Sequence, residues 1–322
     1  MQIWYYETSA VNTLMESMSS DDAIQTKSLQ EMKGRDWCIS PMTLIEILQT
    51  SCPEKRDKII HFSQRLFNRE LLASPEEIII NYINNGFPKE EPRYRLKSNS
   101  AFGNIWRDVV DNPEKQIFID IDELKAKAKA IKSFSKNLHK IINNDDVIIL
   151  PNSENEHLEY SLESMLNELT FIKEDEPYSA QQCKCYKIAI YYLMVLVCCQ
   201  AGPSPECSNV LWEKLGIHCT AGRITYALKN WETLIYRGPL VLMAQMAFCQ
   251  AQVDFSRGVY YDSLHAFYIT YSDMFFTNDK HFGLLREKLA NTPLHYKIHI
   301  MSEVELLKEE NTGDFKADMI IT

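Results

Sequence analysis

Two short apolar segments near opposite ends of the chain constrain its fold most. Each has the length of a buried strand, and each is closely followed by an acidic residue and a helical pattern. The segments run from Ile3 to Tyr6, before Glu7, and from Met274 to Thr277, before Asp279. In parallel α/β sheets, ligands bind outside the carboxyl ends of the strands. The two carboxylates are therefore predicted to meet at one edge of a parallel sheet.

The segments around these two strands continue the same pattern of strands and helices. Ser40-Pro41 marks a helix start, because Ser favours the N-cap and Pro the first helical position. Strands that alternate with helices imply a parallel sheet with right-handed crossovers. The further predicted strands are Trp37 to Ile39 and Lys297 to Met301. The predicted helices are Thr8 to Met18, Ser20 to Lys33, one from Pro41, Pro239 to Val253, one from Asp262, and Asp279 to about Ala290.

The middle of the chain changes character, because helical periodicity replaces strand-like segments from about Cys52 to Gly238. One helix is expected from His157 to Lys173, and another, apolar on nearly all sides and therefore buried, from Gln181 to Gln200. We thus predict an α/β domain with a short parallel sheet, formed by 1–53 and 239–310. A mostly α-helical insertion would occupy 54–238, and a C-terminal tail 311–322.

The composition is that of an ordinary soluble protein. The 322 residues are 45% hydrophobic and 24% charged, and the net charge of −10 argues against binding nucleic acid with the whole surface. A local basic patch remains compatible with it. The N-terminus does not resemble a signal peptide, and the longest apolar segment, Ile188 to Ala201, is shorter than a membrane span. We expect a cytoplasmic protein with no membrane partner.

The nine cysteines contain no CxxC pair, which favours reduced thiols in a cytoplasmic protein. A zinc site is the alternative interpretation, although the spacing fits no familiar ligand pattern. Its candidate ligands are Cys183, Cys185, Cys207, His218 and Cys219.

Four acidic residues are the candidates for chemistry: Glu7, Glu46, Asp262 and Asp279. Each is expected where a strand ends or a helix begins. Carboxylates that share a pocket raise one another's pKa unless a cation neutralises them, and oxygen ligands suit Mg²⁺ or Mn²⁺. One or two such ions can activate a water to attack a phosphodiester. The alternative is structural: Asp262 and Asp279 as N-caps and Glu46 as a solvated side chain.

The order of these motifs resembles the PIN domain, a family of metal-dependent nucleases that includes many bacterial toxin ribonucleases. The similarity lies in Ile3 to Ser9, Ser40 to Glu46, Asp262 to Ala266, Phe276 to Asp279 and Lys297 to Met301. The resemblance implies a PIN-like three-layer α/β/α fold with a short parallel sheet. It also implies a ribonuclease whose four acids hold the metal, with RNA as a more suitable substrate than DNA. Two features depart from the family: Glu7 stands where it usually has Asp, and the helical insertion is absent from its compact members.

The resemblance also implies roles for the neighbours of these acids. Ser9 and Thr277 would orient carboxylates or bound water through their hydroxyls. Lys280 and His281 would meet a phosphate, unless both are simply exposed residues at a helix start. His265 has two interpretations as well, a buried packing histidine or a contact to the substrate.

The insertion offers a basic face. Lys125, Lys129, Lys132, Lys136 and Lys140 recur at spacings of three and four, so they line one side of a helix. Such a face is either solvated or a place where phosphates bind. Arg93 and Arg95 flank Tyr94, and guanidinium groups beside an aromatic ring suit a single nucleic-acid strand.

The sequence therefore predicts a metal-dependent ribonuclease. The alternative is a PIN-like scaffold with impaired catalysis, whose insertion binds a protein or nucleic-acid partner. The resemblance alone motivates a role as a toxin or an antiviral-defence effector that an inhibitory or activating protein controls.

Overall fold

The computed structural model describes residues 2–75, 77–78, 101–112, 148–149, 159–160, 239–251, 259–303, 305–307 and 318–320. The chain divides into two compact units. The first unit comprises Met1–Ser74, Arg93–Ile121 and Tyr268–Thr322, and the second comprises Pro75–Pro92 and Asp122–Phe267.

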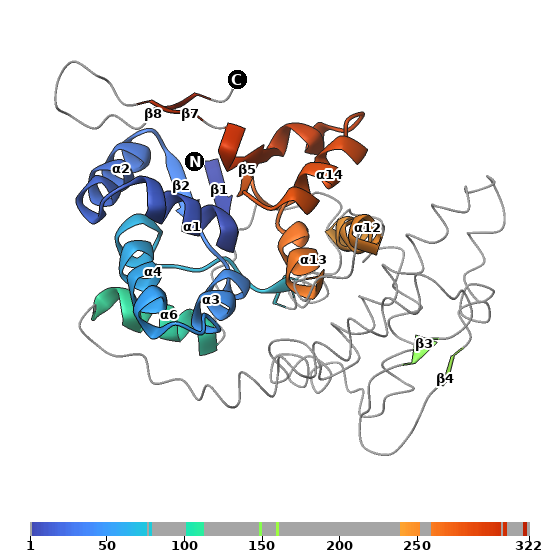
Figure 1. Cartoon of the computed structure of the whole chain (residues 1–322), viewed down its shortest axis with the longest axis horizontal. Coiled ribbons are helices and arrows are strands. Elements are labelled where there is room, and N and C mark those ends of the chain that lie inside the picture. Colours follow the sequence, from blue (N-terminus) through green and yellow to red (C-terminus); the bar gives the residue numbers. More distant parts are fainter. Residues whose placement is uncertain are drawn as a thin grey trace. The chain divides into compact units, whose positions relative to one another are not determined.

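A four-stranded parallel sheet forms the centre of the first unit. Its strands are β1 (Gln2–Tyr6), β2 (Arg35–Cys38), β5 (Met274–Thr277) and β6 (Ile298–Ile300), in the order β2-β1-β5-β6. Tyr5 lies opposite Cys38 on one side and Phe275 on the other. The beginning of the chain is therefore inserted between β2 and β5 (Figure 1). The four predicted strands and their parallel arrangement are confirmed.

Aromatic side chains fill both faces of this sheet. Trp4, Tyr5 and Tyr6 are completely buried, as expected for a central strand covered on both sides. Because side chains alternate along a strand, Tyr6 stacks on Phe276 with ring centroids 4.6 Å apart, while Tyr5 stacks on Tyr268 at 4.7 Å. The two apolar layers fix β1 and β5 side by side.

The helices of the first unit begin and end where local chemistry favours it. Ser40 caps α3 (Pro41–Leu48) by accepting a hydrogen bond from Met42 N at 3.2 Å, and Pro41 takes the first helical position. Gly34, with φ 71°, follows α2 (Ser20–Met32) and turns the chain into β2. The predicted helices α1 (Thr8–Ser17), α2, α3 and α14 (Lys280–Lys288) are confirmed.

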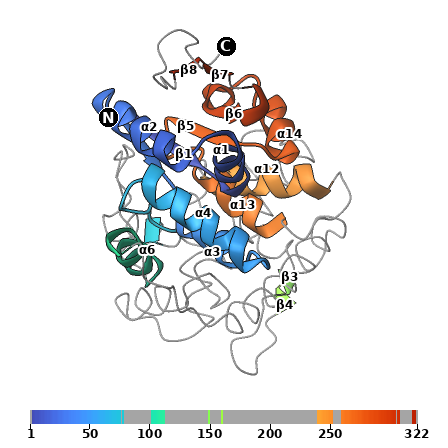
Figure 2. The same ribbon diagram turned by 60° about the vertical axis from the view of Figure 1, so that its left-hand side comes forward.

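Packing of the helices places them around the sheet (Figure 2). Helix α2 contacts β2 and α4 (Pro53–Leu66), α1 contacts β5, and α14 contacts β6. The segment after α4 covers the outer edge of β2, because Asn68 N donates to Trp37 O at 2.9 Å and Leu72 N donates to Ile39 O at 3.0 Å. These bonds satisfy backbone groups that an open edge strand would leave unpaired.

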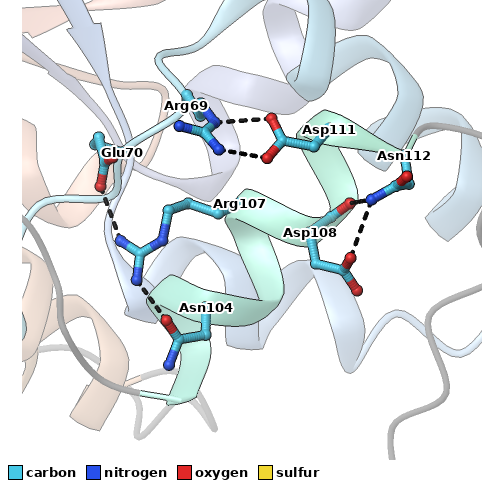
Figure 3. Close-up of polar contacts among 7 residues, drawn as sticks. All are labelled: Arg69, Glu70, Asn104, Arg107, Asp108, Asp111 and Asn112. Atoms are coloured by element: carbon cyan, nitrogen blue, oxygen red, sulfur yellow. Dashed lines mark hydrogen bonds and ion pairs between the residues drawn. The ribbon is translucent and has the colours of Figure 1, made fainter.

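Helix α6 (Ala101–Asp111) is attached to that same segment. Trp106 is completely buried, and its indole Nε1 donates to Asn68 O at 2.8 Å. Figure 3 shows two arginine contacts between α6 and this segment: Arg69 forms a two-pronged ion pair with Asp111, and Arg107 Nη1 lies 2.9 Å from Glu70 Oε2. Helix α6 is thus part of the first unit.

In the second unit, the structure gives the bounds of two helices and two short strands. Helices α12 (Pro239–Ala251) and α13 (Val259–Phe267) pack against each other. Strands β3 (Ile148–Ile149) and β4 (Glu159–Tyr160) pair antiparallel. The prediction of a helix beginning at His157 is wrong at Glu159 and Tyr160, whose backbone pairs with two β-branched residues instead.

The C-terminal part forms further short elements. After the 3₁₀ helices η2 (Pro293–Lys297) and η3 (Met301–Glu303), strands β7 (Glu305–Leu307) and β8 (Asp318–Ile320) pair antiparallel.

The two compact units meet at other positions in the sequence than the predicted domain boundaries, 53/54 and 238/239. Residues 54–74 and 93–121 belong to the first unit, and 239–267 to the second. The predicted domain boundaries stay a prediction.

Candidate metal site at the carboxyl edge of the sheet

The carboxyl edge is the side of the sheet where β1, β2 and β5 end, at Tyr6, Cys38 and Thr277. Glu7 follows β1 directly and is buried, with 4% of its surface exposed. It is the N-cap of α1: its carboxylate accepts hydrogen bonds from Ser9 N at 2.9 Å, from Ala10 N at 3.2 Å, and from the Ser9 hydroxyl. A negative charge is favourable at this end of a helix.

Glu7 also reaches the end of β5. Asn278 N donates to Glu7 Oε1 at 3.3 Å and to Ser9 Oγ at 2.7 Å, and Glu7 N donates to Phe276 O at 3.2 Å. The ends of β1 and β5 are therefore joined through one carboxylate and one hydroxyl. The prediction that both strand ends meet at one edge is confirmed.

Glu46 approaches the same edge from α3. It is the sixth of eight helix residues, so the expectation that it lies near the helix start is wrong. Ser40 caps α3 as predicted, and this start places Glu46 beyond the first turn of the helix. Glu46 is half-buried and accepts a hydrogen bond from the hydroxyl of Thr8, the first residue of α1. Glu46 therefore keeps part of its surface in solvent, as the solvated interpretation expected, but its carboxylate also has a partner in α1.

The hydroxyl of Tyr5 belongs to the same group of polar atoms. It lies 2.9 Å from Ser40 Oγ and 3.3 Å from Thr43 Oγ1. Burial raises its pKa strongly, the hydrogen bonds to Ser40 and Thr43 oppose the rise, and the charges of Glu7 and Glu46 add to it. The phenol therefore stays protonated, and Glu7 and Glu46 both act on it from the carboxyl edge.

Asp279 follows β5 and is the N-cap of α14, as the structural alternative predicted. Its Oδ1 accepts from His281 N at 2.7 Å and lies 2.9 Å from His281 Nδ1, while Asp279 N donates to Thr277 Oγ1 at 3.0 Å. The Asp279 side chain is 32% exposed. Lys280 is exposed, but His281 is buried, so the interpretation of both as exposed residues is wrong for His281.

Asp262 lies in the second unit. Helix α13 begins at Val259, so Asp262 is in its first turn and is not an N-cap. Its Oδ2 accepts from Gln250 Nε2 of α12 at 2.5 Å. His265, one turn further along α13, is buried, which agrees with the packing interpretation.

Three of the four predicted acids, Glu7, Glu46 and Asp279, thus share the carboxyl edge of the first unit. The hydroxyls of Ser9 and Thr277 make the contacts described above, and their roles stay a prediction. Sequence reasoning missed Thr8 and Tyr5 beside Glu46, and Asn278 beside Glu7. Thr8 could have been found from the sequence, because a hydroxyl residue directly follows the strand-end acid Glu7. The Asn278 contact could not, because it is made by the backbone amide.

Several predicted residues lie outside the described part of the chain. They include the apolar segment 188–201, the candidate zinc ligands 183–219, and the basic residues Arg93, Arg95, Lys125, Lys129, Lys132, Lys136 and Lys140. Within the described ranges, no helix combines the length and apolar character needed to cross a membrane.

The chain was compared with known proteins. No protein-family model matches it, and neither the curated proteins nor the solved structures gave a match.

Proposed function

We propose that this protein is a metal-dependent nuclease that hydrolyses phosphodiester bonds, with RNA as its main substrate. The observation that carries the proposal is the convergence of Glu7, Glu46 and Asp279 on the edge where three adjacent parallel strands end. This edge is the usual ligand site of parallel α/β sheets.

The donor set fits a hard divalent cation. Carboxylate and hydroxyl oxygens are the ligands that Mg²⁺ and Mn²⁺ prefer, and Glu46 and Asp279 both retain exposed surface. These two residues would hold the ion, and the family resemblance assigns Glu7 and Asp262 to it as well. A bound ion supplies a water of lowered pKa and stabilises charge on the leaving oxygen.

The chain's own contacts would orient the ligands. Thr8 donates to Glu46 and thereby fixes one carboxylate oxygen. Thr277 accepts from Asp279 N, and Asp279 in turn caps α14. Contacts of this kind set the geometry of metal ligands and commonly change affinity or activity by about 10- to 100-fold.

Cleavage of a mixed pool of single-stranded and structured RNA and DNA tests the proposal, in Mn²⁺, in Mg²⁺ and in EDTA. We expect metal-dependent cutting of RNA that falls by at least about 100-fold in Asp279→Asn and in Asp262→Asn. Because Asn is also a good N-cap, and because a repulsive charge is removed, the melting temperature of Asp279→Asn should be unchanged or higher.

Asp273→Asn is the matched control, because Asp273 precedes the same strand at its other end, where its Oδ2 accepts from Ile3 N at 2.8 Å. It should cut like the wild type. Full activity of either Asp279→Asn or Asp262→Asn would overturn the proposal.

One observation favours the alternative of a non-catalytic scaffold. The carboxylate of Glu7 is buried and already accepts from four donors of its own chain, as a structural residue would. A wild type that cuts no substrate in any metal, yet binds a partner tightly in EDTA, would support the scaffold.

A further inference from the structure

We propose that Glu7 is a positioning residue: its side chain holds the turn between β5 and α14, and this turn carries Asp279. The catalytic consequence of this inference rests on the proposed function, whereas the positioning itself concerns the metal-free protein.

The length of the Glu7 side chain is the first argument. Capping a helix requires only a short acceptor, and Asp, Asn, Ser and Thr are the residues that usually do it. Glu7 caps α1 through Ser9 N and Ala10 N, which a shorter Asp would also reach. Its additional methylene brings Oε1 within 3.3 Å of Asn278 N, 271 positions along the chain. The longer side chain thus joins two turns that a cap alone would leave separate.

The Ser9 hydroxyl strengthens this junction. It donates to Glu7 Oε1 and accepts from Asn278 N at 2.7 Å. The side chain of Asn278 adds a third contact, since its Nδ2 donates to Thr13 Oγ1 at 3.2 Å. Asn278 is therefore held by three residues of the segment that follows β1, and Asp279 is the next residue.

Burial is the second argument. A carboxylate that is 4% exposed needs donors or a cation to offset its lost hydration. Glu7 receives three backbone amides and one hydroxyl, and such charge-assisted hydrogen bonds are about twice as strong as neutral ones. The protein supplies the compensation itself, so the position of Glu7 does not depend on a bound ion.

Hydrogen exchange of the Asn278 amide tests the positioning. It is measured by NMR on the metal-free protein for the wild type, Glu7→Asp, Ser9→Ala and the double variant. Loss of a hydrogen bond should speed exchange of Asn278 about tenfold in each single variant. The Ala10 amide should stay protected in Glu7→Asp, because Asp still caps α1. Because Glu7 and Ser9 both bind the Asn278 amide, its exchange rate in the double variant should rise by less than the product of the two single-variant factors.

Asp22→Asn is the control, because Asp22 accepts from Ser19 in the capping box of α2. It should leave the exchange of Asn278 unchanged. Unchanged exchange of Asn278 in Glu7→Asp would overturn the inference.

Mn²⁺ affinity provides the second readout. Ser9→Ala keeps every carboxylate. It should therefore lower the Mn²⁺ affinity, by about tenfold, only if the position of the turn between β5 and α14 affects metal binding. Faster Asn278 exchange in the variants of a protein that binds no Mn²⁺ would support positioning and remove the metal proposal. Lower Mn²⁺ affinity in Glu7→Asp with unchanged Asn278 exchange would make Glu7 a ligand and overturn the inference.

Discussion

At the residue scale, His299 shows how burial changes the chemistry of one side chain. Its ring, on β6, lies 5.3 Å from the ring of Phe276. Burial and the charge of Arg286 lower its pKa to about 4, although Glu303 acts in the opposite direction. The folded protein therefore favours the neutral imidazole.

This pKa shift predicts a dependence of stability on pH. As the pH falls, His299 takes up a proton near pH 6.5 in the unfolded chain but only near pH 4 in the folded protein. The stability that His299 contributes is therefore present above pH 6.5 and is lost as the pH falls to 4. Allowing for partial exposure, the loss is about 2 kcal/mol.

Urea unfolding of the wild type and His299→Phe at pH 4, 5 and 6.5 checks this expectation. The variant keeps an aromatic ring against Phe276 and cannot titrate. Its free energy of unfolding should fall less with acid than that of the wild type. Parallel curves for the two proteins would contradict the assignment.

At the element scale, α6 shows how one buried side chain attaches a helix. Trp106 combines complete burial with a hydrogen bond from its indole nitrogen, whereas the arginine pairs beside it are exposed or half-buried. Exposed ion pairs contribute little to stability, so Trp106 should dominate the attachment of α6.

Trp106→Ala should lower the free energy of unfolding by about 3 to 5 kcal/mol, because it removes a large buried ring and leaves a cavity. Ile24→Ala serves as the control. Ile24 is 48% exposed on α2, so its truncation should cost about 0.5 kcal/mol or less. Urea denaturation of both variants makes the comparison. Equal losses would show that Trp106 does not attach α6.

The elements of the sheet were predictable from local signals. Apolar strands such as Met274 to Thr277 and caps such as Ser40-Pro41 act over a few residues, so their bounds follow from the sequence. The start of α13 could not be predicted in this way, because Asp262 looks like a cap whereas the helix begins at Val259. The contact between Glu7 and the Asn278 amide could not be predicted either, since it depends on the length of the Glu7 side chain and on a residue 271 positions away.

At the scale of the whole molecule, the two ends of the chain build one sheet. Strand β1 lies between β2 and β5, so acids from distant parts of the sequence reach the carboxyl edge together. Strand order and the rule of parallel connections predict that convergence. They do not predict which of the two capping carboxylates is buried and which keeps exposed surface, and this difference separates Glu7 from Asp279.

A titration with Mn²⁺, followed by the electron paramagnetic resonance of the free ion, shows whether the carboxyl edge binds a divalent cation. The proteins are the wild type, Asp279→Asn and Asp273→Asn. The wild type and Asp273→Asn should bind one or two ions equally well, while Asp279→Asn should bind at least about tenfold more weakly. Equal affinity in all three proteins, or no binding by the wild type, would show that Asp279 and the carboxyl edge do not hold the ion.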